Sequence, residues 1–228
     1  MPFVFAECVE GEAMPSAATT EIRHRDTGAL IHTVDSGSLA GRVFQGMKMP
    51  GANFAGMDLT GADFQRADLR EADFTGCKLD GANFASALLS GATFDGATMV
   101  KADLTDCFAK GVGFHGCNLR SATLRYAKLA ECDFSEARLA SADLSIAELG
   151  CDFSRADLSS ADMRGANLAD AVFDGAKLAG TNMIDAQTAK ADFAGACLEG
   201  CLMAPGKKMG PQMFKPKVKA AWWQFWAS

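Results

Sequence analysis

Eight cysteines are the residues of this 228-residue sequence best suited to redox or metal chemistry. Six of them occupy the same position of a five-residue repeat, where alanine is the usual residue: Cys77, Cys107, Cys117, Cys132, Cys151 and Cys201. Free cysteine packs as a small apolar residue, so we interpret these six as core-filling side chains. Cys197 and Cys201 form a C-x3-C pair, but their positions in the repeat point one side chain outward and the other inward. This arrangement disfavours a zinc site.

The repeat places Cys132 and Cys151 on adjacent coils, with their Cα atoms ~4.8 Å apart. That separation permits a disulfide, but in-register stacking points both Cβ atoms the same way. The first residues carry Glu7, Glu10 and Glu12 where a signal peptide needs basic and then apolar residues. We therefore expect a cytoplasmic protein with free thiols, no metal and no cofactor.

The remaining candidates for catalysis do not assemble into a known pattern. His24 and His32 lie on a predicted hairpin and could approach each other, but no acidic or thiol partner is fixed nearby. His115 is expected to point outward. G-x-S-x-G, H-E-x-x-H and P-loop patterns are absent from the sequence. The many aspartates recur at one polar position of the repeat and read as solvated surface. We expect no enzymatic activity and no small-molecule substrate.

The element that positions most of these residues is a repeat of five. From Phe44 a bulky apolar residue recurs every fifth position to Leu149, and after one missing residue the count restarts at Phe153 and runs to Met203, about 33 repeats in all. Leu39 is a partial first copy. A small residue two places earlier also points inward, and the polar residue between them points out. The last two residues turn a corner, where Gly is frequent because tight backbone costs it least.

Side-chain size predicts four sides per coil, because only a spacing of four repeats stacks like on like. The "Phe side" then has the inward column Phe54, Phe74, Phe94, Phe114, Phe134, Phe153, Phe173 and Phe193. The "Leu/Met side" runs from Leu59 to Leu198, the "mixed side" from Phe44 to Met203, and the "Ala109 side" contains the weak spots Ala109 and Thr188. The Phe column crosses the missing residue intact, so we place that deletion at a corner near Gly150. At ~4.8 Å per coil, eight coils make a rod ~38 Å long.

The pattern A-(D/N)-(L/F)-x-x, as in Ala62-Asp63-Phe64 and Ala166-Asn167-Leu168, resembles the pentapeptide repeat family. The resemblance covers about 160 residues and implies an all-β fold, the right-handed quadrilateral β-helix. The residues themselves divide the chain into three parts. Residues 1–38 form an N-terminal segment with a capping hairpin at 22–34, residues 39–204 form the β-helix, and residues 205–228 form a basic and aromatic tail.

The tail contains five lysines, no acidic residue and an aromatic cluster, Trp222, Trp223, Phe225 and Trp226. Three roles suit this composition. The aromatic residues could plug the last coil, form a homodimer contact through that terminus, or dock on a membrane surface.

Charge on the rod is sorted by side. The Phe side carries seven acidic residues against Arg155 alone: Asp73, Asp95, Asp133, Glu136, Asp152, Asp174 and Asp192. Because phosphate binding needs cationic surface, the acidic body argues against nucleic acid as a direct ligand. A rigid rod with one acidic side is instead suited to imitate duplex DNA. Some members of the resembling family bind DNA gyrase in this way and protect it from topoisomerase poisons.

The sequence therefore predicts a non-enzymatic protein-binding rod. The specific hypothesis is a DNA mimic that binds DNA gyrase or topoisomerase IV. The alternative is a structural or scaffold module of a membrane- or secretion-associated complex, which would use the aromatic tail.

Overall fold

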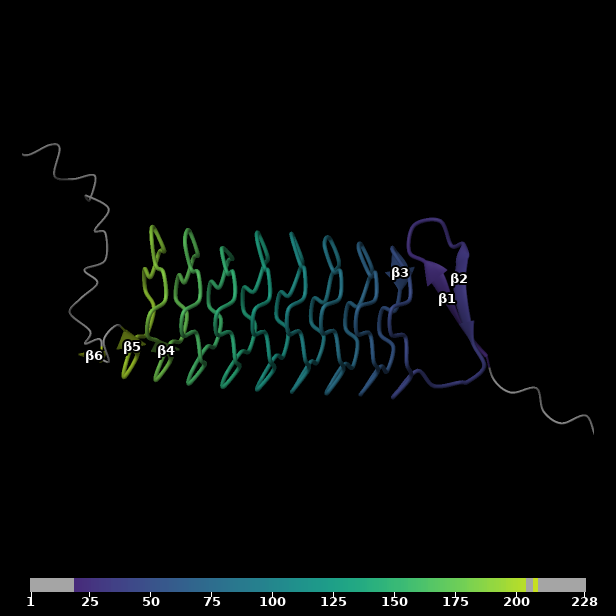
Figure 1. Cartoon of the computed structure of the whole chain (residues 1–228), viewed down its shortest axis with the longest axis horizontal. Coiled ribbons are helices and arrows are strands. Elements are labelled where there is room, and N and C mark those ends of the chain that lie inside the picture. The colour runs from purple at the N-terminus through teal and green to yellow at the C-terminus, as the bar shows by residue number, and fades with distance from the viewer. Residues whose placement is uncertain (1–18, 204–206, 209–228) are drawn as a thin grey trace, which may run out of the picture.

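A computed structural model describes residues 19–203 and the backbone of residues 207–208, and shows a straight rod of stacked coils (Figure 1). Bridged residues of neighbouring coils are parallel and lie 20 positions apart, as in the series Asp63, Asn83 and Asp103. Twenty residues are four repeats, so each coil has four sides, as side-chain size predicted. Within the described ranges no helix is long and apolar enough to cross a membrane.

Each side of a coil is held by a short bridge and ends in a tight turn. The amide of Phe64 donates to the carbonyl of Asn83 on the next coil at 2.7 Å, and the amide of Ala62 closes the preceding corner by donating to Leu59 at 3.0 Å. The second corner residue has positive φ, such as 66° at Gly61. Glycine accepts this conformation freely, whereas other residues pay about 1–2 kcal/mol. This explains the glycine preference at the corner.

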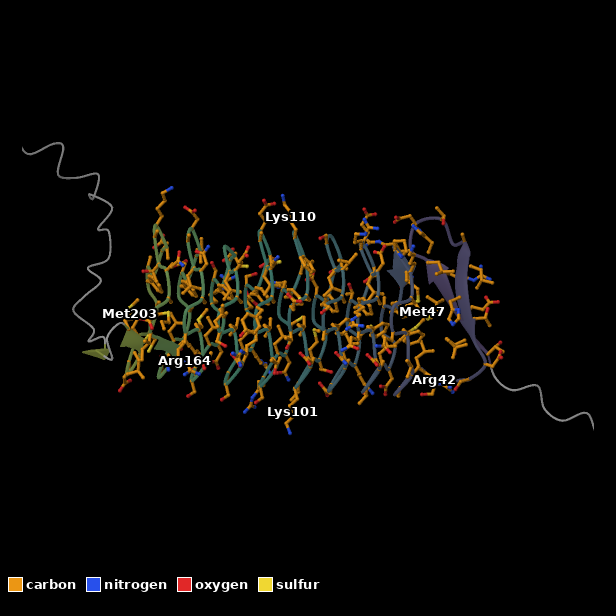
Figure 2. The ribbon with its side chains drawn as sticks, viewed as in Figure 1. Arg42, Met47, Lys101, Lys110, Arg164 and Met203 are labelled. Carbon is orange, nitrogen blue, oxygen red and sulfur yellow. The ribbon has the colours of Figure 1, made fainter. Side chains whose placement is uncertain are left out.

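The core is a set of side-chain columns rather than a single cluster, and side chains fill the interior of every coil (Figure 2). Rings of the Phe side stack from coil to coil, with centroids 4.8 Å apart between Phe54 and Phe74 and 4.6 Å between Phe114 and Phe134. In the first coils, rings from the opposite mixed side meet them edge-on, as Phe64 meets Phe74 at 5.6 Å and 81°. Stacked and edge-to-face rings are both favourable, so the Phe column predicted from the sequence is confirmed.

The missing residue removes one corner position without disturbing the ladder. Pairs that span it lie 19 apart, as in Asp133 with Asp152, and the spacing returns to 20 from Asp152 to Val172. The amide of Cys151 donates to the carbonyl of Leu149 at 2.8 Å, closing a three-residue turn. The predicted deletion near Gly150 is confirmed.

A hairpin covers one edge of the first coil. Strands β1 (Thr20–His24) and β2 (Leu30–Val34) pair antiparallel, and β1 also pairs antiparallel with β3 (Ala52–Asn53) of the first coil (Figure 1). Ile22 is fully buried against the core. Because β1 pairs with backbone groups of β3 that an open edge would leave unpaired, the hairpin protects this end of the rod from association with other strands.

The other end carries three short strands. Strands β4 (Asn182–Met183) and β5 (Leu202–Met203) are parallel, and β6 (Lys207–Lys208) pairs antiparallel with β5. Strand pairing thus continues into the predicted tail. The aromatic cluster of that tail lies outside the described residues, and its three possible roles stay predictions.

Candidate protein-binding faces

The inward cysteines have a structural role that the repeat explains. The thiol of Cys77 donates to the carbonyl of Phe54 on the preceding coil, 2.9 Å away, and the hydroxyl of Thr181 makes the same bond to Leu158 at 2.8 Å. Burial raises the pKa of Cys77 to about 11 and that of Cys117 to about 12, which keeps these thiols protonated and unreactive at neutral pH. Cys197 is exposed and Cys201 is buried, as their opposite directions predicted.

The histidines do not form a shared site. His32 pairs with Ile22, so the two histidines that could approach each other are not direct partners across the hairpin. The His24 ring instead covers Gly51, where an added Cβ would clash with its Nε2 atom. His115 points outward, as expected, and contacts Ser135 at 2.9 Å. Within the described ranges, no three His, Cys, Asp or Glu side chains are grouped to hold a metal ion.

The polar position of the repeat has a structural function that the sequence reading missed. The first corner residue has an amide that makes no backbone hydrogen bond in the regular coil, and the preceding Asp or Asn side chain accepts from it. Asp133 accepts from the amide of Ser135 at 2.8 Å, and Asn83 does the same for Ala85 at 2.9 Å. Such turns are typical of Asp and Asn. The prediction of mere solvated surface therefore needs correction, because these side chains satisfy backbone donors.

Where the polar position lacks Asp or Asn, the preceding coil can supply the acceptor. Asp95 accepts from the amide of His115 at 3.0 Å, because Gly113 has no side chain to do so. Asp80 likewise accepts from the amide of Val100 at 2.8 Å. The corner amide therefore accounts for part of the acidic content of the rod, whatever its function.

The seven acidic residues of the Phe side form one face of the rod. Asp133, Glu136, Asp152, Asp174 and Asp192 are exposed, whereas Asp73 and Asp95 are half-buried. Asp133 and Asp152 are direct neighbours on the ladder. Arg155 pairs with Glu136 at 2.7 Å and is the one basic side chain of this face. Because exposed pairs are weak, the face remains strongly acidic.

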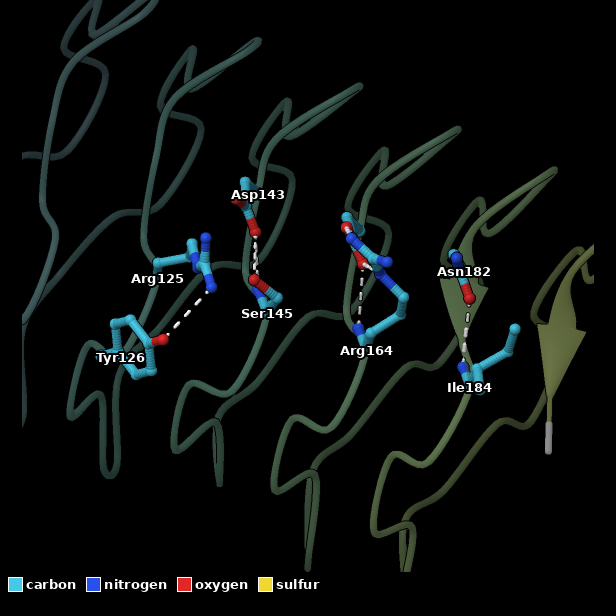
Figure 3. A network of polar contacts seen from close by, with 8 residues as sticks. Arg125, Tyr126, Asp143, Ser145, Arg164, Asn182 and Ile184 are labelled. Carbon is cyan, nitrogen blue, oxygen red and sulfur yellow. Dashed lines mark hydrogen bonds and ion pairs between the residues drawn. The ribbon is translucent and has the colours of Figure 1, made fainter. Parts of the chain in front are cut away.

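The mixed side, opposite the Phe side, also carries aspartates but interleaves them with arginines. Figure 3 shows its successive coils, with Asp143 accepting from Ser145 and Asn182 accepting from the amide of Ile184. Arg164 forms a close pair with Asp162 at 2.6 Å, which lowers the pKa of that carboxyl. The net negative charge is therefore smaller on this side than on the Phe side.

A second feature, missed by the sequence reading, is a group of exposed apolar side chains: Leu88, Phe108, Tyr126 and Ile146. Leu88 and Phe108 occupy the polar position of adjacent coils on the Ala109 side, and Tyr126 and Ile146 occupy the corner position where Gly is common. These departures from the repeat are visible in the sequence, although only the ladder shows that the four are neighbours.

Comparisons with known proteins agree with this architecture. The family described as "Pentapeptide repeat region" matches residues 47–124, and "Pentapeptide repeats (8 copies)" matches residues 114–149, 151–187 and 166–203. No curated protein sequence matched the chain.

Among solved structures, trypsin-treated QnrB1, a plasmid-mediated fluoroquinolone resistance protein, is 21% identical over 74% of this chain and 91% of its own, with a TM-score of 0.50. HetL from the cyanobacterium Nostoc, which is involved in the regulation of heterocyst differentiation, is 27% identical over 75% of this chain and 89% of its own, with a TM-score of 0.38. With its four-sided coils and these matches, the chain belongs to the pentapeptide repeat family and has the right-handed quadrilateral β-helix fold.

Proposed function

We propose that this protein is a non-enzymatic, cytoplasmic DNA mimic whose acidic Phe side binds DNA gyrase or topoisomerase IV and protects the enzyme from topoisomerase poisons. The partner's cationic DNA-binding surface would take up the acidic side in place of duplex DNA. The protein would then act by occupying that surface rather than by chemistry of its own.

The observation that carries the proposal is the acidic Phe side itself. Its seven carboxylates are spread over coils that repeat every ~4.8 Å, close to one per coil. One strand of duplex DNA presents a phosphate about every 3.4 Å. The stacked Phe rings beneath hold this spacing rigidly, since a packed core resists deformation. A protein surface built to follow a DNA backbone therefore meets a comparable line of charge.

The relationship to solved structures supports the proposal at the level of fold. QnrB1 has the same architecture and is named as a fluoroquinolone resistance protein. Fluoroquinolones are topoisomerase poisons, so the function we propose has a precedent on this fold. The acidic side of the present chain makes the proposal specific.

The test removes charge without removing the corner hydrogen bonds. In the triple variant Asp133→Asn, Asp152→Asn and Asp192→Asn, each Asn retains an oxygen that can accept from the corner amide, as Asn83 and Asn182 already do. Binding to purified gyrase at low salt should weaken by about tenfold or more, since three exposed contacts are lost at up to about 1 kcal/mol each. Protection of supercoiling from a fluoroquinolone should fall in parallel.

The matched control is Asp63→Asn, Asp103→Asn and Asp143→Asn on the mixed side, where each aspartate caps an equivalent amide. The control has the same net charge change and should bind gyrase almost as the wild type does. Equal loss in both variants would show that total charge matters rather than the Phe side. If the wild type binds neither gyrase nor topoisomerase IV at low salt, the proposal is wrong.

A further inference from the structure

Four exposed apolar side chains follow one edge of the rod over consecutive coils. Leu88, Phe108, Tyr126 and Ile146 are 38%, 39%, 46% and 49% exposed. Leu88 pairs with Phe108 and Phe108 with Lys128, so Tyr126, two residues before Lys128, lies next to Phe108. Ile146 stacks one coil beyond Tyr126. We name these four residues the Tyr126 edge, where the mixed side meets the Ala109 side.

The local structure of the repeat does not account for these residues. Leu88 and Phe108 replace the Asp or Asn that would accept from the corner amide. Tyr126 has a φ of 59° and Ile146 a φ of 60°, a conformation that is unfavourable for bulky and especially for β-branched side chains. Strained or exposed apolar residues of this kind point to a contact surface.

Cations lie on the aromatic rings of this edge. The guanidinium of Arg125 is 5.1 Å from the centre of the Tyr126 ring, and the Lys128 Nζ atom is 4.7 Å from that of Phe108. Neither cation has a salt bridge among the described residues, and neither has Asp106, exposed on the coil before Arg125. The edge therefore offers apolar surface together with charges of both signs that form no salt bridge among the described residues.

We propose that the Tyr126 edge binds a second copy of this chain, forming an antiparallel dimer with two-fold symmetry. The order aliphatic, aromatic, aromatic, aliphatic reads the same in both directions, so the two-fold places the coil of Leu88 against the coil of Ile146 in the second copy, and the coil of Phe108 against that of Tyr126. Arg125 then faces Asp106 of the second copy, and symmetry makes each contact twice. A shallow depression of about 300 Å³ lies beside Ile146 at this edge and is lined by Arg125, Ser145, Arg164, Gly165 and Asp185.

The position of this edge on the rod suits the pairing of two acidic molecules. It lies diagonally across the rod from the corner between the Phe side and the Leu/Met side, which carries Asp95, Glu136 and Asp174. The pairing therefore keeps the acidic corners of the two copies far apart, and like charges repel less with distance. It also leaves both acidic Phe sides facing solvent.

The first test measures the mass of the full chain by light scattering and sedimentation equilibrium. The wild type should form a dimer of 24.0 kDa subunits. The variant Leu88→Asn, Phe108→Asn, Tyr126→Gly and Ile146→Gly should be monomeric. Each substitution introduces a residue type that the chain already uses at that repeat position. The variant should therefore remain folded, which a thermal melt of the monomer checks. A monomeric wild type, or a variant that still dimerises, overturns the proposal.

The second test fixes the register of the pair by charge exchange. Arg125→Asp and Asp106→Arg should each weaken the dimer by about tenfold, because like charges then face each other twice. Each introduced residue type has a precedent at its position, in Asp95 and in Arg66. The double variant should restore dimerisation to within about threefold of the wild type. Failure of the double variant to recover affinity overturns the antiparallel pairing.

Discussion

The Phe side and the Ala109 side share one backbone repeat and differ in how strictly their side chains follow it. The Phe side stacks the same ring on every coil, whereas the Ala109 side places Ala109 between Leu89 and Leu129 and turns Phe108 outward. The backbone hydrogen bonds are the same on both sides. The amide of Ala109 donates to the carbonyl of Lys128 at 2.9 Å, and the amide of Phe114 donates to the carbonyl of Asp133 at 2.7 Å. The ladder tolerates a missing bulky residue, which leaves individual coils free to acquire other roles.

Larger side chains on either side of Ala109 explain why the ladder tolerates the missing bulky residue. Cys107 and Val112 occupy small inward positions on either side of Ala109, and both are larger than the usual alanine. Their volume replaces part of what Ala109 lacks. Packing in one coil is therefore shared between adjacent sides, while the Phe column depends on its own uninterrupted stack.

The largest expected effect is on that stack. Phe134→Ala should reduce the free energy of unfolding by about 3–5 kcal/mol, because it opens a cavity between two stacked neighbours. Leu129→Ala, above Ala109, should cost less, about 2 kcal/mol, since its column is already interrupted. Denaturant unfolding followed by circular dichroism measures both. Equal losses would show that the Phe column has no special weight.

Overpacking should have an intermediate effect. Ala127→Leu fills a fully buried small position and should cost about 1–3 kcal/mol. Ala109→Leu adds the same atoms at a bulky position whose neighbours in the column are leucines, and should cost less than Ala127→Leu. Thermal unfolding of the two variants compares them directly. If Ala109→Leu proves the more damaging, the interior space around Ala109 is already filled by its neighbours.

Loss of a hydrogen-bond acceptor at a corner should have a smaller effect on stability still. Asp133→Ala leaves the amide of Ser135 without its side-chain acceptor and should reduce the free energy of unfolding by about 0.5–1.5 kcal/mol. Asp133→Asn keeps an acceptor and should be nearly neutral. Chemical denaturation at constant pH distinguishes the two. A loss of stability that is the same for Asn and Ala would mean that charge, rather than the hydrogen bond, stabilises the corner.

The smallest expected effect is a dependence of stability on pH, through Asp68 on the Ala109 side. Hydrogen bonding to Arg70 lowers the pKa of Asp68. A lowered pKa in the folded state stabilises the fold above the unfolded value of about 3.9 and loses that contribution as the pH falls. Because Arg70 is largely exposed, the contribution should not exceed about 1 kcal/mol. Asp68→Asn should therefore show a smaller loss of stability between pH 5 and pH 3, in thermal melts, than the wild type. An unchanged pH dependence would contradict this.

Most of the architecture could be predicted from the sequence alone. The five-residue period, the four sides, the Phe column and the deletion near Gly150 all follow from side-chain size, because each coil contacts only its neighbours and so like residues recur in register. The hairpin before the first coil was also visible, because its turn and alternating residues are local signals.

Other features depended on the folded ladder. Asp133 looked like solvated surface in the sequence, and its hydrogen bond appeared only when the backbone pattern showed which corner amide lacks a partner. The approach of His24 to Gly51 depends on β1 pairing with β3, a long-range contact. Phe108 and Tyr126 belong to different positions of the repeat, so no single period connects them. Only the stacking of one coil on the next places these two residues on neighbouring coils of one edge, because stacking is set by backbone hydrogen bonds between coils and not by the spacing of residues within one coil.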